Sequence, residues 1–293
     1  MSDATGTSGG AGTGTLGVAG VGLIGGSIAA AVKARGMFGR VIGFGRSVDR
    51  LEAALRAGLI DDYATEYGPA CRDADLFVSC LPVDRIADSL REAAARMKPG
   101  SVVTDAGSVK RSICSAVGPE PAPGVTFVGS HPLAGSERQG FEHADADLFV
   151  GRTCVLTPCG GEPAAAVERV ASFWRGLGSE VVTLSAGEHD AVLARTSHLP
   201  HLVAAAVAAA LSEGQERFAA GGFRDTTRIA AGDPDLWASI LLGNREAVGE
   251  ALGEFIGRCE AFRRALAAGD GASLRELLHD AKRRRDAFAR VFK

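Results

Sequence analysis

The chain has 293 residues, of which 46% are hydrophobic, and this is enough apolar material for one large or two ordinary globular domains. Its 32 basic and 35 acidic residues nearly cancel, for a net charge of −3, and no basic stripe is interleaved with aromatic residues. The balance argues against nucleic acid or an anionic membrane as a partner. The basic cluster Lys282–Arg285 lies in a helical pattern and is interpreted as a solvated helix face.

The six cysteines include no C-x-x-C pair, which favours a chain that stays in the reducing cytoplasm. The N-terminus has no basic segment followed by an apolar core, and no apolar run approaches the ~20 residues that a bilayer span requires. We therefore expect a cytoplasmic protein without a signal peptide or membrane helix. Residues 1–14 are rich in Gly, Ser and Thr and are expected to form a flexible tail.

A short apolar run leads into Gly20, Gly22 and Gly25, which have G-x-G-x-x-G spacing. In a dinucleotide-binding turn the first glycine permits the tight turn, the second lets the backbone approach a pyrophosphate, and the third lets the helix pack on the strand. A helical pattern at 24–35 and a buried strand pattern at 40–44 complete a βαβ unit. Cofactor contacts are expected from the turn and from the end of the apolar run at 76–81, namely Gly20, Gly22, Leu23, Ile24, Gly25, Leu81 and Pro82.

Short β-rich runs alternate with helical stretches as far as about Leu184, with later strands expected at 102–104, 125–128, 153–156 and 180–183. This alternation predicts an α/β fold, a doubly wound Rossmann-type dinucleotide-binding domain over 15–186. From Gly187 the pattern is helical only, with helices expected at 190–211, 237–259 and 273–292. The predicted all-helical domain, 187–293, begins with a helix that is apolar nearly all round, which favours burial against another helix layer such as that of a second subunit.

The residue that distinguishes NAD from NADP sites follows the second predicted strand. An Asp or Glu about 20 residues beyond the glycines binds the ribose hydroxyls in NAD-preferring sites, but this chain has Gly45 there. Arg46 and Ser47 follow, a guanidinium and a hydroxyl suited to a 2′-phosphate, and no carboxylate occurs before Asp49. NADP is therefore favoured over NAD. The alternative is that Arg46 stacks on adenine while NAD binds without its usual acid.

Two polar segments, Asp105–Lys110 and Gly129–Gly135, follow predicted strands. Ligands of such sheets bind beyond the carboxyl ends of the strands. His131 is therefore expected to take or polarise the proton of a hydroxyl on the carbon that loses hydride, and Ser108 to hydrogen-bond the same oxygen. The alternative is a structural histidine at a strand end.

The helical part adds a second polar set. His189 and Asp190 begin the first long helix, and Pro200 is expected to distort it because proline removes one helical N–H. Histidines near an Asp can bind zinc, but no H-E-x-x-H motif or cysteine ligand accompanies these, so no metal is expected. Satisfied core histidines remain the alternative. The residues of interest on this helix are Ser197, His198 and His201.

Arg224 and Arg228 stand four residues apart with Asp225 between them, a pattern that suits bidentate recognition of a carboxylate. One of the two can instead pair with Asp225. Asp233, followed by a proline, is expected to cap the next helix and to direct Trp237 back toward this loop.

Five motifs occur in one order over residues 16–240: G-x-G-L-I-G-G-S, D-A-G-S-V-K, G-S-H-P-L-A-G, H-D-x-x-x-A-x-x-S-H-L-P-H and F-R-D-T-T-R-I-A. In these motifs the chain resembles the prephenate/arogenate dehydrogenases of tyrosine biosynthesis. The resemblance implies oxidative decarboxylation of a cyclohexadienol, in which hydride leaves ring C4 for NAD(P), CO2 leaves C1, and the ring becomes aromatic.

The resemblance also implies residue roles. His131 would accept the C4 hydroxyl proton, Ser108 would orient that hydroxyl, and Arg228 would anchor the carboxylate. A homodimer through the helical domains is implied as well. The substrate side would be lined by Ser197, His198 and His201.

Several alternatives stay open at this level. The loop 136–139 can face the keto or amino group that separates prephenate from arogenate, but sequence does not give its direction. No regulatory or mutase-like segment is recognised, so a monofunctional enzyme is expected, and tyrosine feedback would have to act at the active site. The other hypotheses are a β-hydroxyacid or imine-type dehydrogenase and an NADP-binding sensor without turnover.

Overall fold

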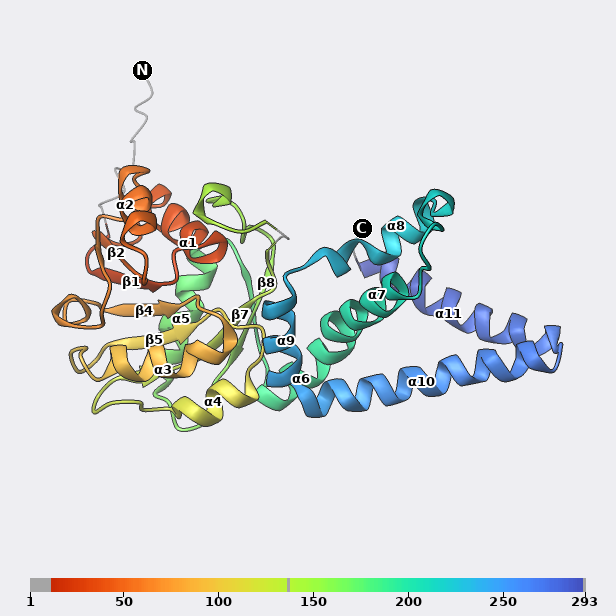
Figure 1. The fold of residues 1–293 in the computed structure, drawn as a ribbon. Helices are drawn as coiled ribbons and strands as arrows, with labels where there is room; N and C mark the ends of the chain where they lie inside the picture. The colour runs from red at the N-terminus through yellow and green to blue at the C-terminus, as the bar shows by residue number, and fades with distance from the viewer. Residues whose placement is uncertain (1–11, 136–137, 292–293) are drawn as a thin grey trace, which may run out of the picture. The chain divides into compact units, whose positions relative to one another are not determined.

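The computed structural model describes residues 12–135 and 138–291, which form two compact units that meet in sequence between Arg245 and Glu246 (Figure 1). The first unit holds two β-sheets and most of the helices. The second begins at Glu246, within helix α10 (Arg245–Ala267), and also holds helix α11 (Gly271–Val291). The domain boundary expected at 186 stays a prediction.

The main sheet has six parallel strands in the order β3-β2-β1-β4-β5-β6. This order reverses between β1 and β4, which creates the switch point where dinucleotides bind in such folds. The doubly wound fold is therefore confirmed. The strands are β1 (Thr15–Ala19), β2 (Arg40–Phe44), β3 (Asp62–Ala64), β4 (Leu76–Ser79), β5 (Val102–Asp105) and β6 (Thr126–Phe127).

A second sheet follows, with β7 (Gly129–Pro132) antiparallel to β8 (Thr153–Thr157), and β8 parallel to β9 (Glu180–Thr183). The sequence pattern predicted the last two of these strands but placed His131 beyond a strand end. His131 instead lies within β7, opposite Val155. The chain leaves the main sheet at Val128, whose N–H still donates to the carbonyl of Val103 at 3.1 Å.

Two of the predicted long helices are interrupted in the first unit. A π-helical turn at Ala194–His198 divides the first, which confirms the distortion expected before Pro200. Asn244 divides the second. The helices are α1 (Leu23–Ala34), α2 (Val48–Arg56), α3 (Val83–Ala94), α4 (Arg111–Val117), α5 (Ala164–Gly176), α6 (Ala186–Leu193), α7 (Leu199–Ala209), α8 (Gly221–Thr227) and α9 (Pro234–Gly243).

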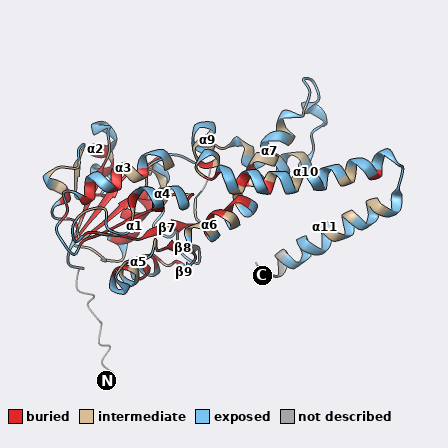
Figure 2. Ribbon diagram, turned by 90° about the horizontal axis from the view of Figure 1, so that it is seen from below, coloured by how far each residue is buried: buried red, intermediate tan, exposed pale blue. Residues whose placement is uncertain are grey.

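Two apolar clusters form the core of the first unit, which Figure 2 shows as the red region of the sheets and their helices. One combines Leu16 and Val18 of β1 with Trp174 of α5. The other combines Phe77 of β4 with Ile240 of α9. Because Ile240 is 4% exposed within this second cluster, α9 is anchored to the layer that carries the sheet.

Some expectations concern residues outside the described ranges. The predicted tail lies mostly at 1–11, and of its remainder Gly12 donates its N–H to the carbonyl of Gly36 at 2.7 Å. Residues 136–137 of the loop 136–139 are also outside, so the direction of this loop stays a prediction. Within the described ranges, no helix is long and apolar enough to cross a membrane.

Candidate active site

The glycine turn between β1 and α1 has the geometry that its spacing predicts. Gly20 has φ of +84°, and a Cβ there would lie 2.8 Å from the carbonyl oxygen of Cys80. A Cβ on Gly25 would lie 2.2 Å from the carbonyl oxygen of Gly20. Around Gly22 nothing lies within 4 Å. The outer glycines are therefore required by packing, whereas the backbone at Gly22 is open to a ligand.

Helix α1 begins beside this opening without a side-chain cap. Gly22 is its N-cap residue, and its first turn contains no acidic residue. The N–H groups of the first turn, including those of Leu23 and Ile24, can therefore bind a phosphate. Leu81 lies across the turn from Gly20, and Pro82 caps α3 at the end of β4. The open glycine turn and the free N–H groups at the start of α1 fit the pyrophosphate of a dinucleotide.

The residues expected to select the cofactor follow β2. Arg46 and Ser47 are exposed. The Ser47 hydroxyl caps α2 by accepting the Arg50 N–H at 3.4 Å, which leaves its O–H able to donate. A Cβ on Gly45 would make only an ordinary contact, at 3.6 Å from Leu51. This position thus has room for a carboxylate that the chain does not carry.

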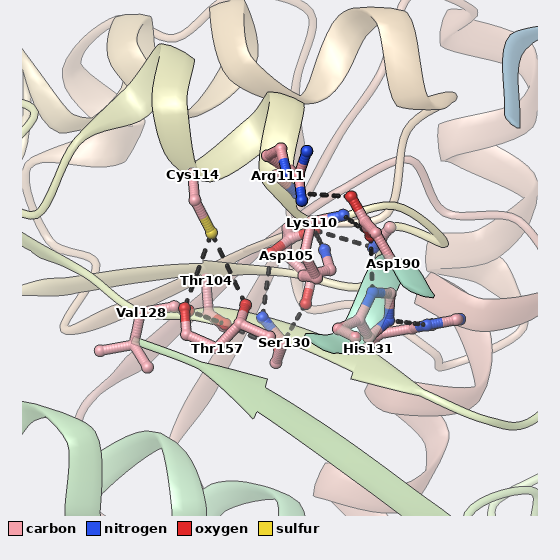
Figure 3. Close-up of polar contacts among 12 residues, drawn as sticks. Thr104, Asp105, Lys110, Arg111, Cys114, Val128, Ser130, His131, Thr157 and Asp190 are labelled. Carbon is pink, nitrogen blue, oxygen red and sulfur yellow. Dashed lines mark hydrogen bonds and ion pairs between the residues drawn. The ribbon is translucent and has the colours of Figure 1, made fainter. Parts of the chain in front are cut away.

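His131 begins a chain of three buried polar side chains. Its Nδ1 lies 2.8 Å from Nε2 of His189, and Nδ1 of His189 lies 2.8 Å from Oδ1 of Asp190 (Figure 3). His131 is 8% exposed, whereas His189 is fully buried. Strand β7 supplies the first residue and α6 the other two, so these elements meet at the imidazole.

Asp190 also fixes the start of α4. Its Oδ1 accepts the Lys110 N–H at 2.8 Å, and its Oδ2 accepts the Arg111 N–H at 2.9 Å. Burial alone would raise the pKa of Asp190, but the hydrogen bonds from His189 and from these two N–H groups lower it. The carboxyl group is therefore ionised at neutral pH.

Lys110 and Asp105 form a fully buried ion pair at the two ends of the loop that carries Ser108. Asp105 also accepts the N–H of Gly107 at 2.9 Å and that of Ser130 at 3.0 Å. These contacts hold the half-buried Ser108 loop against β7, next to His131. Breaking a buried pair of this kind costs about 3–5 kcal/mol, so the pair fixes the loop firmly.

His131, His189 and the nearby His198 are neutral at pH 7. Burial lowers the pKa of His131 well below its usual value, and positive charge on His189, Lys110 and His198 would lower it further. Burial likewise lowers the pKa of His189, and it lowers the pKa of His198 to about 4. Neutral imidazoles can accept protons, which is the property that general-base catalysis requires.

The π-helical turn carries Ser197, which is half-buried, and His198, which is 1% exposed. The side-chain amide of Asn244 lies 3.1 Å from Nδ1 of His198 and donates to the backbone carbonyl of Asp190 at 2.8 Å. Asn244, at the break between α9 and α10, thus joins the π-helical turn to α6.

His201 lies against Trp237, with ring centroids 3.5 Å apart and planes 12° apart. Its Nδ1 is buried and has no hydrogen-bond partner among the described residues. Gly232 approaches both rings, since a Cβ there would lie 2.5 Å from Trp237 Nε1 and 3.1 Å from His201 Cε1. Asp233 caps α9 as predicted, accepting the N–H groups of Asp235 and Leu236, whereas the expected approach of Trp237 to the loop of Arg224 and Arg228 stays a prediction.

The two candidate arginines differ in their surroundings. Arg224 pairs with Asp225 at 3.3 Å, which is the alternative that the sequence left open for one of them. Arg228 is exposed and begins a 3₁₀ turn, Arg228–Ala231, that packs against α7. Among the described residues no group of three or more His, Cys, Asp or Glu side chains could hold a metal ion.

Two family models match the chain: the nucleotide-binding domain of prephenate dehydrogenase over residues 28–183 and its dimerization domain over 185–280. The chain belongs to the prephenate dehydrogenase family. It is an oxidoreductase of the nicotinamide-dependent kind.

Individual relatives agree with the family models. A cyclohexadienyl dehydrogenase of Zymomonas mobilis is 35% identical over 269 residues, which are 89% of this chain and 92% of the relative. A prephenate dehydrogenase of Bacillus subtilis is 34% identical over 90% of this chain and 73% of its own length. The crystal structure of prephenate dehydrogenase from A. aeolicus, in complex with hydroxyphenyl propionate and NAD+, superposes with a TM-score of 0.86 at 28% identity and covers 94% of this chain and 98% of that one.

The structure of the present chain also shows three residues of the polar network to which the sequence assigned no role, namely Lys110, Asp190 and Asn244. Lys110 and Asp190 lie inside motifs that were recognised, but their burial and mutual contacts have no sequence signal of their own. Asn244 contacts residues 46 and 54 positions away in the sequence. Only the unexpected end of a helical pattern could have indicated it.

Proposed function

We propose that this chain oxidises and decarboxylates prephenate or arogenate, giving 4-hydroxyphenylpyruvate or tyrosine. A bound nicotinamide supplies the hydride acceptor for ring C4. The C4 hydroxyl passes its proton to the protein, CO2 leaves from C1, the electron pair of the broken C–C bond completes the aromatic ring, and the protein returns the proton to the C4 oxygen. The observation that carries the proposal is a neutral, almost fully buried His131 in contact with the helical segment through His189.

In this proposal His131 is the base that takes the hydroxyl proton, and Ser108 orients the hydroxyl. The Asp105–Lys110 loop carries Ser108, and the hydrogen bond from the Ser130 N–H to Asp105 holds this loop against strand β7, which carries His131. Aromatisation supplies much of the driving force, so the protein mainly holds C4 toward the nicotinamide and removes the proton.

Substrate binding is assigned to residues of the helical domain predicted over 187–293. Arg228 is the proposed carboxylate anchor, because Arg224 is already paired with Asp225. Ser197, His198 and His201 are proposed to line the substrate side, and the buried Nδ1 of His201 has no hydrogen-bond partner among the described residues. The carboxylate that Arg228 would bind is the one that leaves as CO2. Because its charge is lost during the reaction, the arginine stabilises the bound substrate more than the transition state, and its main contribution is to orient the substrate.

For the cofactor we propose NADP in preference to NAD. The glycine turn and the start of α1 would hold the pyrophosphate, and Leu81 and Pro82 would contact the cofactor. Exposed Arg46 and the Ser47 hydroxyl would bind the 2′-phosphate, and Gly45 places no negative charge there. We also propose a homodimer through the helical domain, supported by the match to the dimerization domain.

The test is a matrix of prephenate and arogenate with NADP and NAD, followed as reduced nicotinamide and as CO2 released. Equal amounts of both products with at least one substrate support the proposal. Reduction without CO2 would instead favour a β-hydroxyacid or imine-type dehydrogenase. Cofactor binding without reduction in any combination would favour the sensor hypothesis.

A further inference from the structure

The chain from His131 through His189 to Asp190 has a definite hydrogen-bond direction. We propose that His189 and Asp190 are positioning residues that fix one tautomer of His131 and leave its Nε2 as the basic nitrogen. This inference rests on the proposed function for its catalytic meaning, but the tautomer itself can be measured without turnover.

The direction starts at Asp190, because an ionised carboxylate only accepts hydrogen bonds. Nδ1 of His189, 2.8 Å from Oδ1, must therefore carry a proton and donate it. A neutral imidazole has one N–H, so Nε2 of His189 is left as an acceptor. Nδ1 of His131, 2.8 Å from that nitrogen, must then be the donor. Neutral His131 consequently has its lone pair on Nε2.

The surroundings of His131 and His189 favour neutral imidazole rings. Burial lowers the pKa of both histidines. The charged and titratable groups that face them are Lys110 of the Ser108 loop, Asp105 at the end of β5, and His198 of the π-helical turn. Lys110 opposes a second positive charge near His131, so the carboxylate of Asp190 directs the protons without drawing a full charge onto His189.

The consequence for the reaction is that one nitrogen of His131 is reserved for the substrate proton. When Nε2 takes that proton, the existing Nδ1–H···Nε2 contact and the Asp190 carboxylate stabilise the imidazolium that forms. The opposite tautomer would present an N–H to the substrate hydroxyl and could not remove its proton. A correct tautomer of this type contributes orders of magnitude to catalysis in acyl-transfer triads, so it is a substantial effect to test.

The decisive experiment is 15N NMR of histidine-labelled enzyme, in which protonated and bare ring nitrogens have well-separated shifts. His131 is assigned by comparison with His131→Asn. Wild type is expected to show a protonated Nδ1 and a bare Nε2. His189→Phe, which keeps a ring but no acceptor, is expected to shift His131 toward the Nε2–H tautomer and to lower kcat by roughly 10–10³-fold with little change in KM.

Two further variants distinguish an effect on the direction of the hydrogen bonds from an effect on side-chain packing. In His189→Gln the amide oxygen can accept from Nδ1 of His131, so the tautomer and much of kcat should return. Trp174→Phe removes the buried 2.9 Å hydrogen bond to Ser130, the neighbour of His131. It leaves the hydrogen bonds from His131 through His189 to Asp190 intact. It should destabilise the protein without moving the His131 shifts.

An Nε2–H tautomer in wild type would overturn the inference, as would an unchanged tautomer in His189→Phe. A drop in kcat for Trp174→Phe as large as that for His189→Phe would also overturn it, since packing would then account for the effect. Failure of the proposed function looks different: wild type would reduce no cofactor with either substrate while the spectra still reported the tautomer.

Discussion

The imidazole of His201 lies flat on the indole of Trp237, with ring centroids 3.5 Å apart, and Gly232 is the residue that lets the two rings sit there. Nδ1 of His201, beside this stack, is buried and has no hydrogen-bond partner among the described residues. The geometry of the stack depends on the absence of a side chain at position 232, because a Cβ would come within 2.5 Å of the indole nitrogen.

Gly232→Ala is therefore expected to displace the stacked rings and to raise KM for the cyclohexadienol substrate about tenfold, with a smaller effect on KM for the cofactor. Steady-state kinetics with both reactants varied checks this. Gly68→Ala is the matched control, because a Cβ there would meet nothing within 4 Å and φ is −93°. Equal kinetics for the two variants would contradict the role given to the stack.

His131→Asn is expected to lower kcat by roughly 10²–10⁴-fold with little change in substrate KM, because it removes the base while keeping a polar side chain of similar size. Turnover under saturating cofactor is the measurement. Near-normal turnover would exclude His131 as the base. A rise in KM with unchanged kcat would show that it binds the substrate instead.

Arg228→Ala is expected to act on substrate KM. A lost charge-assisted hydrogen bond costs about 1.5–3 kcal/mol, which corresponds to roughly 10–100-fold in KM. Arg224→Ala is the control, since that guanidinium is exposed and already paired with Asp225. If Arg224→Ala has the larger effect, the carboxylate anchor has been assigned to the wrong arginine.

Stability should fall in acid because buried neutral histidines must take up protons when the chain unfolds. For His198 the folded pKa is about 4, below the usual 6.5. The unfolded state therefore binds the extra proton first, and the free energy of unfolding should decrease as pH falls from about 6.5 toward 4, by up to about 1.4 kcal/mol per pH unit for each such group. Urea unfolding at several pH values measures this slope, which should be shallower in His198→Gln.

The local motifs made much of this fold predictable. The alternation of strands and helices, the glycine spacing and the Asp233 cap all depend on residues close together in sequence, and each appears in the structure as expected. The second sheet was not predictable in the same way, because an apolar run indicates a strand without indicating its partner. The antiparallel pairing of β7 with β8 moves His131 from a loop into a strand.

Within the site, residue types were easier to predict than their contacts. The histidines and Ser108 stand out by chemistry, but nothing local shows that Lys110 and Asp105 are fully buried together. The tie from Asn244 to His198 and to the backbone of Asp190 is set by long-range packing. Residues that act through other residues are therefore the ones that sequence reading leaves out.

Cofactor preference gives the last prediction, because position 45 has room for the acid that NAD sites use. A Cβ on Gly45 would lie 3.6 Å from Leu51, so Gly45→Asp should fold normally. Its carboxylate would repel a 2′-phosphate and is expected to raise KM for NADP relative to NAD by at least about tenfold. Arg46→Ala should raise KM for NADP and leave KM for NAD unchanged. Parallel kinetics with both cofactors decide the matter, and a wild-type preference for NAD that persists in Arg46→Ala would exclude the phosphate clamp.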